Sequence, residues 1–570
     1  MTTRDYDFII IGAGSAGCVL ANRLTASGDL RVLLIEAGGR DINPFIHMPA
    51  GISKLVGNPR INWDYDTEPE PELHGRRLYW PRGRVLGGSS SINAMCYIRG
   101  DAADYDEWAA LGADGWNYDA VLPYFRKAER QARGASRYHG AEGPLGVEDL
   151  RYRNPLSSVF LDATTACGYA RNDDFNGESQ AGFGFYQVTQ WRARRSSTAV
   201  AYLRPAFDRS NLTVMTNAQV RRVLIEGDRA VGVEFVRRGQ TQQVRAVREV
   251  LLCGGSVASP QLLMCSGVGP ARELEAVGIP VRVAAPGVGA NLQDHLDYCV
   301  LQKSQSTDTY DFGALREALE GLRYWLTGSG PGASNIAESG GFVRSARAPD
   351  GRADLQFHFV PAQLDDHGRN RLPGHGYTLH ACVLRPRSRG HIGLRSSSMA
   401  DPPRIFANYL SEPEDLRGLI EGVRLSREIL AAAPFDGYRG AELYPGPSRR
   451  SDAELAVAIR EKAETIYHPV GTARMGTDDM SVVDPATMAV HGTQGLFVAD
   501  ASVMPQLVSG NTNAASIMIG AKGSDLIKMT GEVLYRAKDE YAETQDFVGH
   551  IGGDDFVLIT SPDIVEQVCK

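Results

Sequence analysis

The pattern of apolar residues predicts two buried strands at the start of the chain. The runs DFIII (7–11) and RVLLI (31–35) are almost continuously apolar, and each leads into a glycine-containing turn. A short apolar run between turn signals is typical of a strand covered on both faces, as in a parallel sheet. The segment 12–24 between them opens on glycines and continues as a helical pattern. We therefore predict a β-α-β unit over the first 40 residues.

The pattern changes further along the chain. Residues 211–253 alternate apolar and polar side chains around a Gly-Asp turn, which predicts hairpin strands. Helical patterns at 312–326 and 412–433 are mixed with strand-like runs at 354–362 and 376–386. Another strand is predicted within 495–505, ending at Asp500. We interpret residues 306–460 as a second domain inserted into the first, which is then discontinuous in sequence.

The first turn has the form of a dinucleotide-binding loop. Gly12 permits the tight turn, Gly14 lets the backbone approach a pyrophosphate, and Gly17 lets the helix pack closely on its strand. The start of the helix then offers free amides to the phosphates. Glu36 lies 19 positions after Gly17, where an acid accepts hydrogen bonds from the adenosine ribose. A lone glycine motif is weak evidence, but here the strands, the helix and the acid agree.

Composition narrows the class of protein. The chain has 570 residues, with 43% hydrophobic and 22% charged residues and a net charge of −8. These values are typical of a globular protein of several domains and argue against nucleic-acid binding. We see no signal-peptide or membrane-spanning pattern, and the eight cysteines form no C-x-x-C pair. We therefore expect a cytoplasmic protein with free thiols, at most peripheral on the inner face of the cytoplasmic membrane.

Several long motifs, in order, resemble those of the glucose-methanol-choline (GMC) flavin oxidoreductases. Besides the N-terminal loop they are PRGRVLGGSSSINAMCYIRG (81–100), GSVASPQLLMCSGVG (255–269), PGVGANLQDH (286–295), HPVGTARMG (468–476) and VSGNTNAASIMIG (508–520). The resemblance extends from residue 5 to about residue 530. Within the family, the chain is most similar to bacterial choline dehydrogenases and quinone-linked aliphatic alcohol dehydrogenases.

The resemblance implies an α/β fold in which a discontinuous, Rossmann-like FAD-binding domain carries an inserted α+β substrate-binding domain. We assign 1–155, 210–305 and 461–531 to the first domain and 156–209 and 306–460 to the second. Residues 532–570 form a tail. Its GHIGGDDFVLI sequence resembles the hairpin of a GGDEF domain, but so short a segment cannot bury a core of its own. We expect no function of it.

The second glycine cluster suits a flavin. Gly87 and Gly88 let the backbone pass against a flat ring, and the serines that follow leave room and offer donors. The resemblance implies further contacts to FAD, from Val85, Asn93, Ala94, Met95, Cys96, Val220, Asp500, Ala501 and Thr512. The predicted cofactor set also takes in Ser15, Ala16 and Ala37. Some relatives attach the flavin covalently through a histidine at or beside position 92. Ile92 and Asn93 stand there in this chain, so we expect non-covalent FAD.

His468 matches the catalytic histidine of the family. Oxidation of an alcohol requires removal of the hydroxyl proton, and imidazole has a pKa of about 6.5, which suits that task. Asn511 matches the second active-site position. An amide is no base, but it can hold the substrate oxygen by a hydrogen bond.

The resemblance thus implies oxidation of a primary alcohol, aliphatic or choline-like, to the aldehyde. His468 takes the proton, hydride passes to N5 of FAD, and a quinone-type acceptor removes the electrons. Alternatives are an oxidase that uses O2 and a lyase with a redox-silent flavin, as in hydroxynitrile lyases. A signalling role rests only on the tail.

We expect no metal, because the spacing of His358, His367, His375 and His380 matches no compact ligand pattern. We expect this region to form a loop over the substrate pocket, with His358 lining it.

Overall fold

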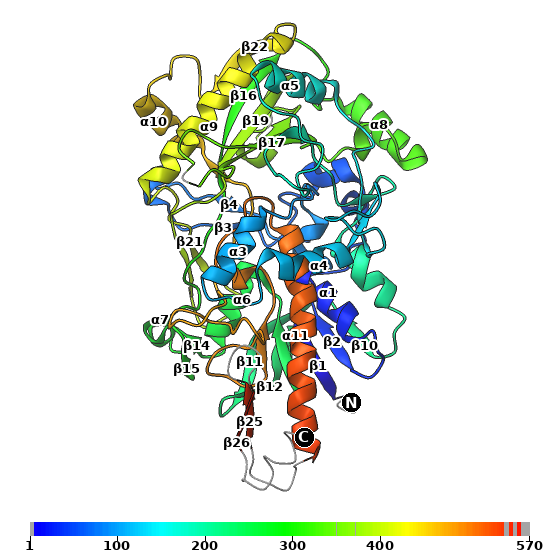
Figure 1. Cartoon of the computed structure of the whole chain (residues 1–570), viewed down its shortest axis with the longest axis vertical. Coiled ribbons are helices and arrows are strands. Elements are labelled where there is room, and N and C mark those ends of the chain that lie inside the picture. Colours follow the sequence, from blue (N-terminus) through cyan, green and yellow to red (C-terminus); the bar gives the residue numbers. More distant parts are fainter. Residues whose placement is uncertain (1–4, 349, 371, 541–546, 551–555, 560–570) are drawn as a thin grey trace.

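The computed structural model describes residues 5–348, 350–370, 372–540, 547–550 and 556–559. Figure 1 shows an elongated molecule with one large sheet in its lower part and another in its upper part. The chain passes between the two parts several times, so each part combines segments that are distant in sequence.

The lower sheet has a parallel core and an antiparallel edge. Its order is β10-β2-β1-β13-β12-β11, and β24 pairs with β13. The strands are β1 (Tyr6–Ile11), β2 (Val32–Ile35), β10 (Leu212–Met215), β11 (Ala218–Glu226), β12 (Arg229–Arg237), β13 (Gln240–Leu252) and β24 (Leu496–Val498). The two apolar runs of the N-terminus become the adjacent parallel strands β1 and β2, as predicted. The hairpin around Gly227 is also confirmed, in β11 and β12. Residues 212–215, however, form a parallel strand beside β2 and no hairpin, because they complete the buried parallel core.

The upper sheet is antiparallel. Its order is β22-β16-β19-β18-β17-β7, and β23 pairs with β16. The strands are β7 (Gly182–Phe185), β16 (Leu296–Ser304), β17 (Ser339–Val343), β18 (Leu355–Val360), β19 (Gly376–Val383), β22 (Arg439–Tyr444) and β23 (Glu464–Thr465). One strand, β7, comes from before the predicted insertion. Two further strands of this sheet, β16 and β23, lie within 210–305 and 461–531, which were assigned to the first domain. The predicted domain boundaries therefore do not follow the two sheets, and they stay predictions.

Helices surround both sheets. They are α1 (Ser15–Leu24), α2 (Pro44–His47), α3 (Ala102–Ala110), α4 (Tyr118–Ala128), α5 (Pro155–Ala166), α6 (Gly255–Cys265), α7 (Ala271–Ala276), α8 (Ala314–Thr327), α9 (Pro413–Ala431), α10 (Asp452–Lys462) and α11 (Asn513–Glu540). The remaining short strands pair in twos: β3 (Tyr65–Asp66) with β4 (Tyr79–Trp80), β5 (Glu129–Gln131) with β6 (Leu145–Val147), β8 (Gln190–Trp191) with β9 (Arg194–Arg195), β14 (Val268–Gly269) with β15 (Val283–Ala284), and β20 (His391–Gly393) with β21 (Arg404–Phe406). A search of the described residues finds no helix with the length and apolar character that a membrane crossing requires.

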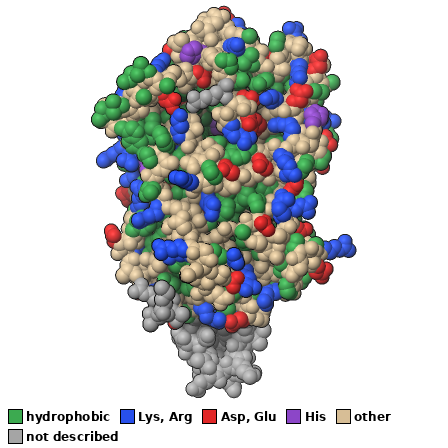
Figure 2. All heavy atoms as spheres, turned by 180° about the vertical axis from the view of Figure 1, so that it is seen from behind, with side chains coloured by type: hydrophobic (Ala, Val, Ile, Leu, Met, Phe, Trp, Pro, Cys, Tyr) green, Lys and Arg blue, Asp and Glu red, His purple; other side chains and the backbone are tan. Residues whose placement is uncertain are grey.

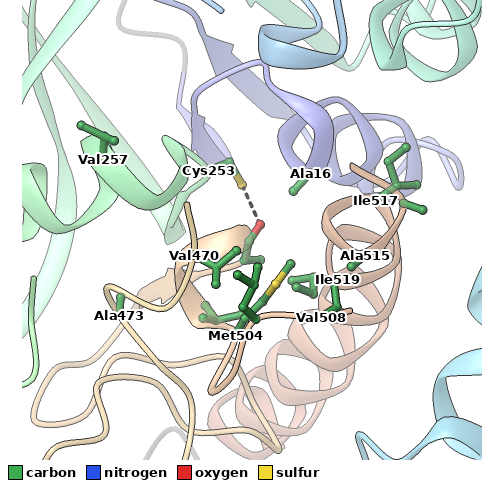
Figure 3. Packing of buried hydrophobic residues seen from close by; sticks show 14 of the residues in the cluster. Ala16, Cys253, Val257, Val470, Ala473, Met504, Val508, Ala515, Ile517 and Ile519 are labelled. Carbon is green, nitrogen blue, oxygen red and sulfur yellow. Dashed lines mark hydrogen bonds between the residues drawn. The ribbon is translucent and has the colours of Figure 1, made fainter. Parts of the chain in front are cut away.

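The core of the lower part joins the two ends of the chain. Helix α11 packs against α1, and buried side chains from both helices face the loop after β13 (Figure 3). There the thiol of Cys253 donates to the carbonyl of Ala499, 246 positions away, at 3.5 Å. Burial of this interface stabilises a fold whose N-terminal strand unit and C-terminal helix are more than 450 residues apart.

The predicted tail lies partly outside the described residues. Helix α11 continues past the expected boundary at 531, to Glu540. Beyond it, β25 (Phe547–His550) and β26 (Phe556–Ile559) pair as antiparallel strands. Residues 541–546, 551–555 and 560–570 lie outside the described part of the chain.

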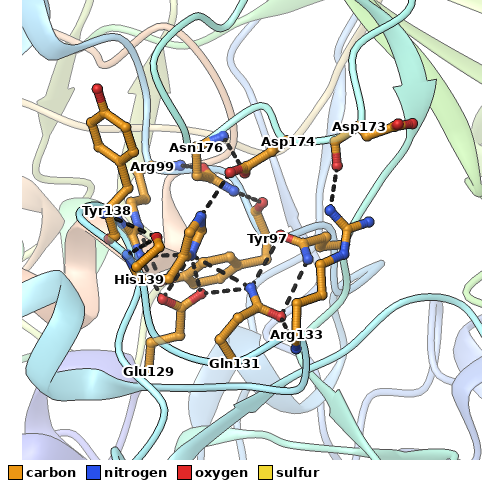
Figure 4. Close-up of polar contacts among 12 residues, drawn as sticks. Tyr97, Arg99, Glu129, Gln131, Arg133, Tyr138, His139, Asp173, Asp174 and Asn176 are labelled. Atoms are coloured by element: carbon orange, nitrogen blue, oxygen red, sulfur yellow. Dashed lines mark hydrogen bonds and ion pairs between the residues drawn. The ribbon is translucent and has the colours of Figure 1, made fainter.

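A buried ionic network joins the segment before α3, the strand β5 and the loop after β5 to the segment near residue 174 (Figure 4). The Arg99 guanidinium pairs with Glu129 at 2.7 Å, and both side chains are almost fully buried. His139 lies between Glu129 and Asp174, 2.9 Å from each. Burial opposes a charge on the ring, but the two carboxylates outweigh it and raise the pKa of His139 to about 9. The network therefore joins two cations and two carboxylates.

Substitution Glu129→Gln is expected to lower the free energy of unfolding by about 3–5 kcal/mol, because it leaves a buried guanidinium without its carboxylate. Denaturant unfolding at pH 7 measures this. The control is Asp162→Asn, which breaks an exposed pair with Arg171 and should change little. An equally small loss for both variants would contradict the prediction.

The stability of the network also depends on pH. Because the pKa of His139 is raised, its contribution to the free energy of unfolding is present below about pH 6.5 and is lost as the pH rises through about 9.

Candidate active site

One large cavity lies between the carboxyl ends of the lower sheet and one face of the upper sheet. Its volume is about 1140 Å³. Most of the predicted site residues line it: Gly12, Gly14, Ser15, Ala16, Glu36, Ala37, Gly88, Asn93, Ala94, Met95, Cys96, Val220, His468, Asp500, Ala501, Asn511 and Thr512. Gly17, Val85 and Gly87 are not among its lining residues. A cavity of this size at the carboxyl ends of parallel strands is where α/β folds bind nucleotide cofactors.

The nucleotide end of the cavity has the geometry that the glycines predict. Gly12 has a φ of +99°, and a Cβ there would lie 2.5 Å from the carbonyl oxygen of Cys253. A Cβ on Gly17 would lie 1.9 Å from the carbonyl oxygen of Gly12, so Gly17 lets α1 pack closely, as predicted. The Glu36 carboxylate follows β2 and accepts hydrogen bonds from the amides of Ala13 and Gly38, at 2.9 and 2.8 Å. These bonds fix an acceptor at the cavity wall, where the ribose of FAD would lie.

The second glycine loop packs against the first. The amide of Gly87 donates to the carbonyl of Ala13 at 2.7 Å, and a Cβ on Gly88 would lie 2.7 Å from the Cα of Gly14. Val85 is fully buried beneath this loop. Close contact between the two loops lets one extended cofactor touch both, so the residues present fit FAD.

Arg195 holds the segment that follows, and the sequence analysis assigned it no role. Its guanidinium donates to the carbonyls of Ser90 and Asn93 and to the Asn93 side chain, at 3.2, 2.7 and 2.7 Å. Burial lowers the pKa of Arg195 to about 9. The only signal in the sequence was the basic run at 192–195, which gives no indication that one of its arginines points inward.

Asp500 is also fixed by this chain. Its carboxylate accepts from the amide of Gly255, the hydroxyl of Ser259, and the amide and hydroxyl of Ser502, at 2.6–2.8 Å. These bonds hold the start of α6 to the loop after β24. A direct contact of Asp500 with a cofactor stays a prediction.

The backbone around His468 aims its ring into the cavity. His468 follows β23, and Tyr467 before it has a φ of +73°, in the left-handed region that side chains rarely adopt. The amide of His468 donates to the Asp294 carboxylate at 2.7 Å. The hydroxyl of Thr465 donates to the same carboxylate at 2.5 Å, and so does that of Tyr409. Burial raises the pKa of Asp294 to about 6. The strained turn is therefore held by several bonds to one carboxylate.

A chain of hydrogen bonds decides which nitrogen of His468 carries the proton. Nε2 of His295 lies 2.8 Å from the carbonyl of Leu384, which can only accept, so this nitrogen donates and Nδ1 of His295 is an acceptor. That Nδ1 lies 2.9 Å from Nδ1 of His468, which must then be the donor. Nε2 of His468 is left with a free electron pair. It lies 3.1 Å from the amide nitrogen of Asn511, which can donate to it.

Both histidine rings are neutral at physiological pH. Burial lowers the pKa of His295 to about 4. Burial, with His295, His358 and Arg82 as further causes, lowers the pKa of His468 well below its ordinary value. Nε2 of His468 is therefore unprotonated over the whole physiological range and can accept a proton from a hydroxyl that takes the place of the Asn511 amide.

The pH dependence of activity should reflect this lowered pKa. An ordinary histidine loses its basic form below about pH 6.5, whereas His468 keeps it to a lower pH. We expect the rate constant for reduction of bound flavin by an alcohol to stay unchanged as the pH falls from about 8 to about 5.5. Anaerobic stopped-flow absorbance measures it. Half-maximal loss near pH 6.5 would contradict this account.

The upper sheet contributes polar groups to the cavity wall opposite the glycine loops. The amide of Gln356 donates to the Asn511 side chain at 3.1 Å and so orients it. His358 lines the cavity, as expected, and neither of its ring nitrogens has a partner although only 5% of the residue is exposed. Burial lowers the pKa of His358 to about 3. A neutral, unpartnered imidazole facing a cavity is suited to bind a polar group of a substrate.

Two further clusters lie on this wall, at Asp297–Cys299–His380 and Asp366–His367–Glu464, and each could offer three ligand atoms to a metal ion. In the first, the His380 ring lies 2.5 Å from the Asp297 carboxylate and 2.9 Å from the Cys299 thiol. These hydrogen bonds already engage the side-chain atoms that would otherwise bind a metal ion. The expectation of no metal stays a prediction. The segment 364–370 lines the cavity in part, in keeping with the loop expected over the pocket.

His295 is the most important residue that the sequence analysis missed. It closes the motif PGVGANLQDH, which was recognised only as part of the family resemblance. No spacing within the chain connects it to His468, 173 positions away. The motif itself was the one available signal.

Two glycine loops packed against each other, with a neutral histidine in the same cavity, are the arrangement of a flavin-dependent oxidoreductase. Family models for GMC oxidoreductases match residues 6–297 and 386–520. The chain therefore belongs to the GMC oxidoreductase family, whose members bind FAD.

Named relatives and solved structures agree with this assignment. An "alcohol dehydrogenase [acceptor]" of Pseudomonas putida is 48% identical over 92% of this chain and 95% of its own length. Mitochondrial choline dehydrogenase of Mus musculus is 46% identical over 92% of this chain and 89% of its own. Pyridoxine 4-oxidase of Mesorbium loti superposes with a TM-score of 0.84 at 32% identity, covering 92% of this chain and 99% of that one. A formate oxidase of Aspergillus oryzae, studied for FAD modification, gives 0.87 at 28%, covering 94% and 100%.

Proposed function

We propose that this protein oxidises a primary alcohol, aliphatic or choline-like, to the aldehyde with FAD and passes the electrons to a quinone-type acceptor. Oxidation at a CH–OH group with flavin follows from the family and from relatives named for alcohol and choline. The observation that carries the proposal is the unprotonated Nε2 of His468, fixed by His295 and facing the cavity.

The chain's own residues account for the proton. The alcohol hydroxyl displaces the Asn511 amide from Nε2 of His468, so that the alcohol oxygen accepts from this amide while Nε2 accepts the hydroxyl proton. Asn511, oriented by Gln356, holds the oxygen so that the C–H bond keeps one direction. FAD, when bound, supplies the two-electron acceptor for the hydride that leaves the carbon. The proposed cofactor contacts are the residues predicted from the sequence: Gly12, Gly14, Ser15, Ala16, Gly17, Glu36, Ala37, Val85, Gly87, Gly88, Asn93, Ala94, Met95, Cys96, Val220, Asp500, Ala501 and Thr512.

The cofactor is proposed to be non-covalent. Ile92 and Asn93 stand where some family members have a linking histidine, and neither side chain can form that bond. Unfolding in acid followed by filtration tests this: FAD should pass the membrane, and flavin retained on the chain would contradict the proposal.

The acceptor and the location belong to the same proposal. A relative named for an unspecified acceptor is compatible with the quinone that we propose. A Yersinia pseudotuberculosis relative named oxygen-dependent choline dehydrogenase makes an oxidase the second candidate. We place the protein in the cytoplasm, peripheral on the membrane where a quinone dissolves.

Anaerobic mixing of the holoenzyme with alcohols tests the reaction. A panel of choline, linear alcohols, polyethylene glycols and aryl alcohols should include one that bleaches the flavin absorbance. No bleaching by any would favour the lyase-like alternative. In air, stoichiometric hydrogen peroxide would identify an oxidase, whereas slow reoxidation that a soluble quinone accelerates is the expected result.

A further inference from the structure

Helix α8 exposes an unusual apolar surface. Its large hydrophobic side chains Leu315, Leu319, Leu322, Trp325 and Leu326 are 76%, 58%, 56%, 46% and 75% exposed. The four leucines follow one another at helical spacing, so they form one stripe along the helix. Other exposed large hydrophobics in the described residues are spread over other segments. Figure 2 shows hydrophobic side chains gathered at the upper left, over α8. Isolated exposed leucines are common, but a continuous stripe marks an interaction surface.

The helix is held to the molecule from its other side. Tyr324 is the residue of α8 that is buried, and its hydroxyl donates to the carbonyls of Ala193 and His47, at 2.9 and 3.2 Å. Glu317 on the same side pairs with Lys54 at 2.7 Å. The leucine stripe is therefore left to face outward.

Basic side chains surround the stripe. Arg316 and Arg323 lie on α8 itself and are exposed, while its acids, Glu317 and Glu320, are paired with Lys54 and Arg323. Arg192 and Arg194 flank Ala193, which Tyr324 contacts, and both are exposed. An apolar stripe bordered by arginines complements a bilayer with anionic headgroups, because the leucines enter the acyl boundary while the guanidinium groups stay at the phosphates.

The same helix borders the active-site cavity. Glu317, Glu320 and Gly321, with Phe312 and Gly313 before the helix, line it. The cavity wall and the apolar stripe are thus two sides of one short helix, about 21 Å long at 1.5 Å per residue. The stripe and the cavity wall are therefore separated by the width of this one helix.

We propose that the stripe of Leu315, Leu319, Leu322, Trp325 and Leu326 is a monotopic docking surface for an anionic lipid bilayer, through which a lipophilic quinone reaches the cavity. Docking itself does not depend on the reaction. Only the route of the quinone rests on the proposed function.

Vesicle flotation of the holoenzyme tests the docking. The probe is vesicles of equal parts phosphatidylcholine and phosphatidylglycerol. The variant Leu315→Gln/Leu319→Gln/Leu322→Gln/Leu326→Gln should bind at least ~100-fold more weakly, because each leucine contributes through its buried apolar area. The control Val457→Gln/Met480→Gln removes exposed apolar side chains elsewhere (44% and 42% exposed) and should bind as the unchanged protein does. Substitution Arg192→Gln/Arg194→Gln should weaken binding to these vesicles about fivefold per arginine and leave binding to pure phosphatidylcholine unchanged.

Tryptophan fluorescence gives a second readout. Vesicles should shift the emission to shorter wavelength, and Trp325→Phe should remove that shift. The proposal is overturned if the unchanged protein does not float, if the glutamine variant floats equally well, or if sedimentation shows that the stripe joins two copies of the chain. Alcohol oxidation with a water-soluble dye, measured on the same samples, separates the two proposals. No dye activity in the unchanged protein counts against the function, whereas loss of vesicle binding with full dye activity in the glutamine variant concerns the stripe alone.

Discussion

Replacement of His468 by alanine is expected to lower the rate of flavin reduction by alcohol by about 10²–10⁴-fold, the usual contribution of a positioned base. The side chain removed is the one whose unprotonated Nε2 is proposed to accept the alcohol proton and accepts from the Asn511 amide in the structure. FAD should remain bound, because the glycine loops that would hold it are untouched. Anaerobic stopped-flow absorbance measures the rate, and the flavin-to-protein absorbance ratio measures occupancy.

The control for this variant is His391→Ala. His391 is exposed and stacks on Phe406, 4.4 Å between ring centroids, on the pair β20–β21. It should reduce the flavin at the unchanged rate. Equal rates for both variants would remove His468 from the chemistry.

Substitution Gly12→Ala is expected to weaken FAD binding by about 100-fold or more, since it combines a strained backbone with a steric overlap. The φ of +99° disfavours any side chain, and the new Cβ would meet the carbonyl oxygen of Cys253 at 2.5 Å. Both segments would have to move, and both line the nucleotide end of the cavity. Flavin content after purification and titration with added FAD measure the effect.

Gly28→Ala separates backbone strain from overlap. Gly28 has a φ of +89°, but nothing lies within 4 Å of a Cβ placed there. This variant should lose about 1 kcal/mol of stability and keep its full flavin content. An equal loss of FAD in both variants would show that general destabilisation, and not the shape of the loop at Gly12, explains the result.

The nucleotide end of the site could be predicted from the sequence because its parts are local. Gly12, Gly14 and Gly17 lie within six residues, and Glu36 follows the next strand. A Cβ on Gly12 or Gly17 would overlap a carbonyl oxygen, at 2.5 and 1.9 Å, so the spacing indicates the geometry there. Gly14 has an ordinary φ of −79° and room for a Cβ, so its role beside a pyrophosphate stays a prediction. The parallel strands β1 and β2 followed from continuous apolar runs for the same reason.

The protonation state of His468, the proposed base, could not be predicted in this way. It depends on a relay from Leu384 through His295 to His468, and the two steps span 89 and 173 positions. The pairing of β16 with β19 and with β23 in the upper sheet brings these groups together. The strand β10 was misread as part of a hairpin because alternation is weak in so short a run, and its pairing with β2 decided its place.

The central claim is that an alcohol oxygen binds against Nε2 of His468. A crystal structure of the oxidised holoenzyme with an unreactive analogue of its best alcohol tests this most directly. We expect the analogue's oxygen to lie about 3 Å from both Nε2 of His468 and the amide nitrogen of Asn511, with the Nδ1 atoms of His468 and His295 still in contact. An analogue bound elsewhere in the cavity, or a His468 ring turned toward another partner, would contradict the account.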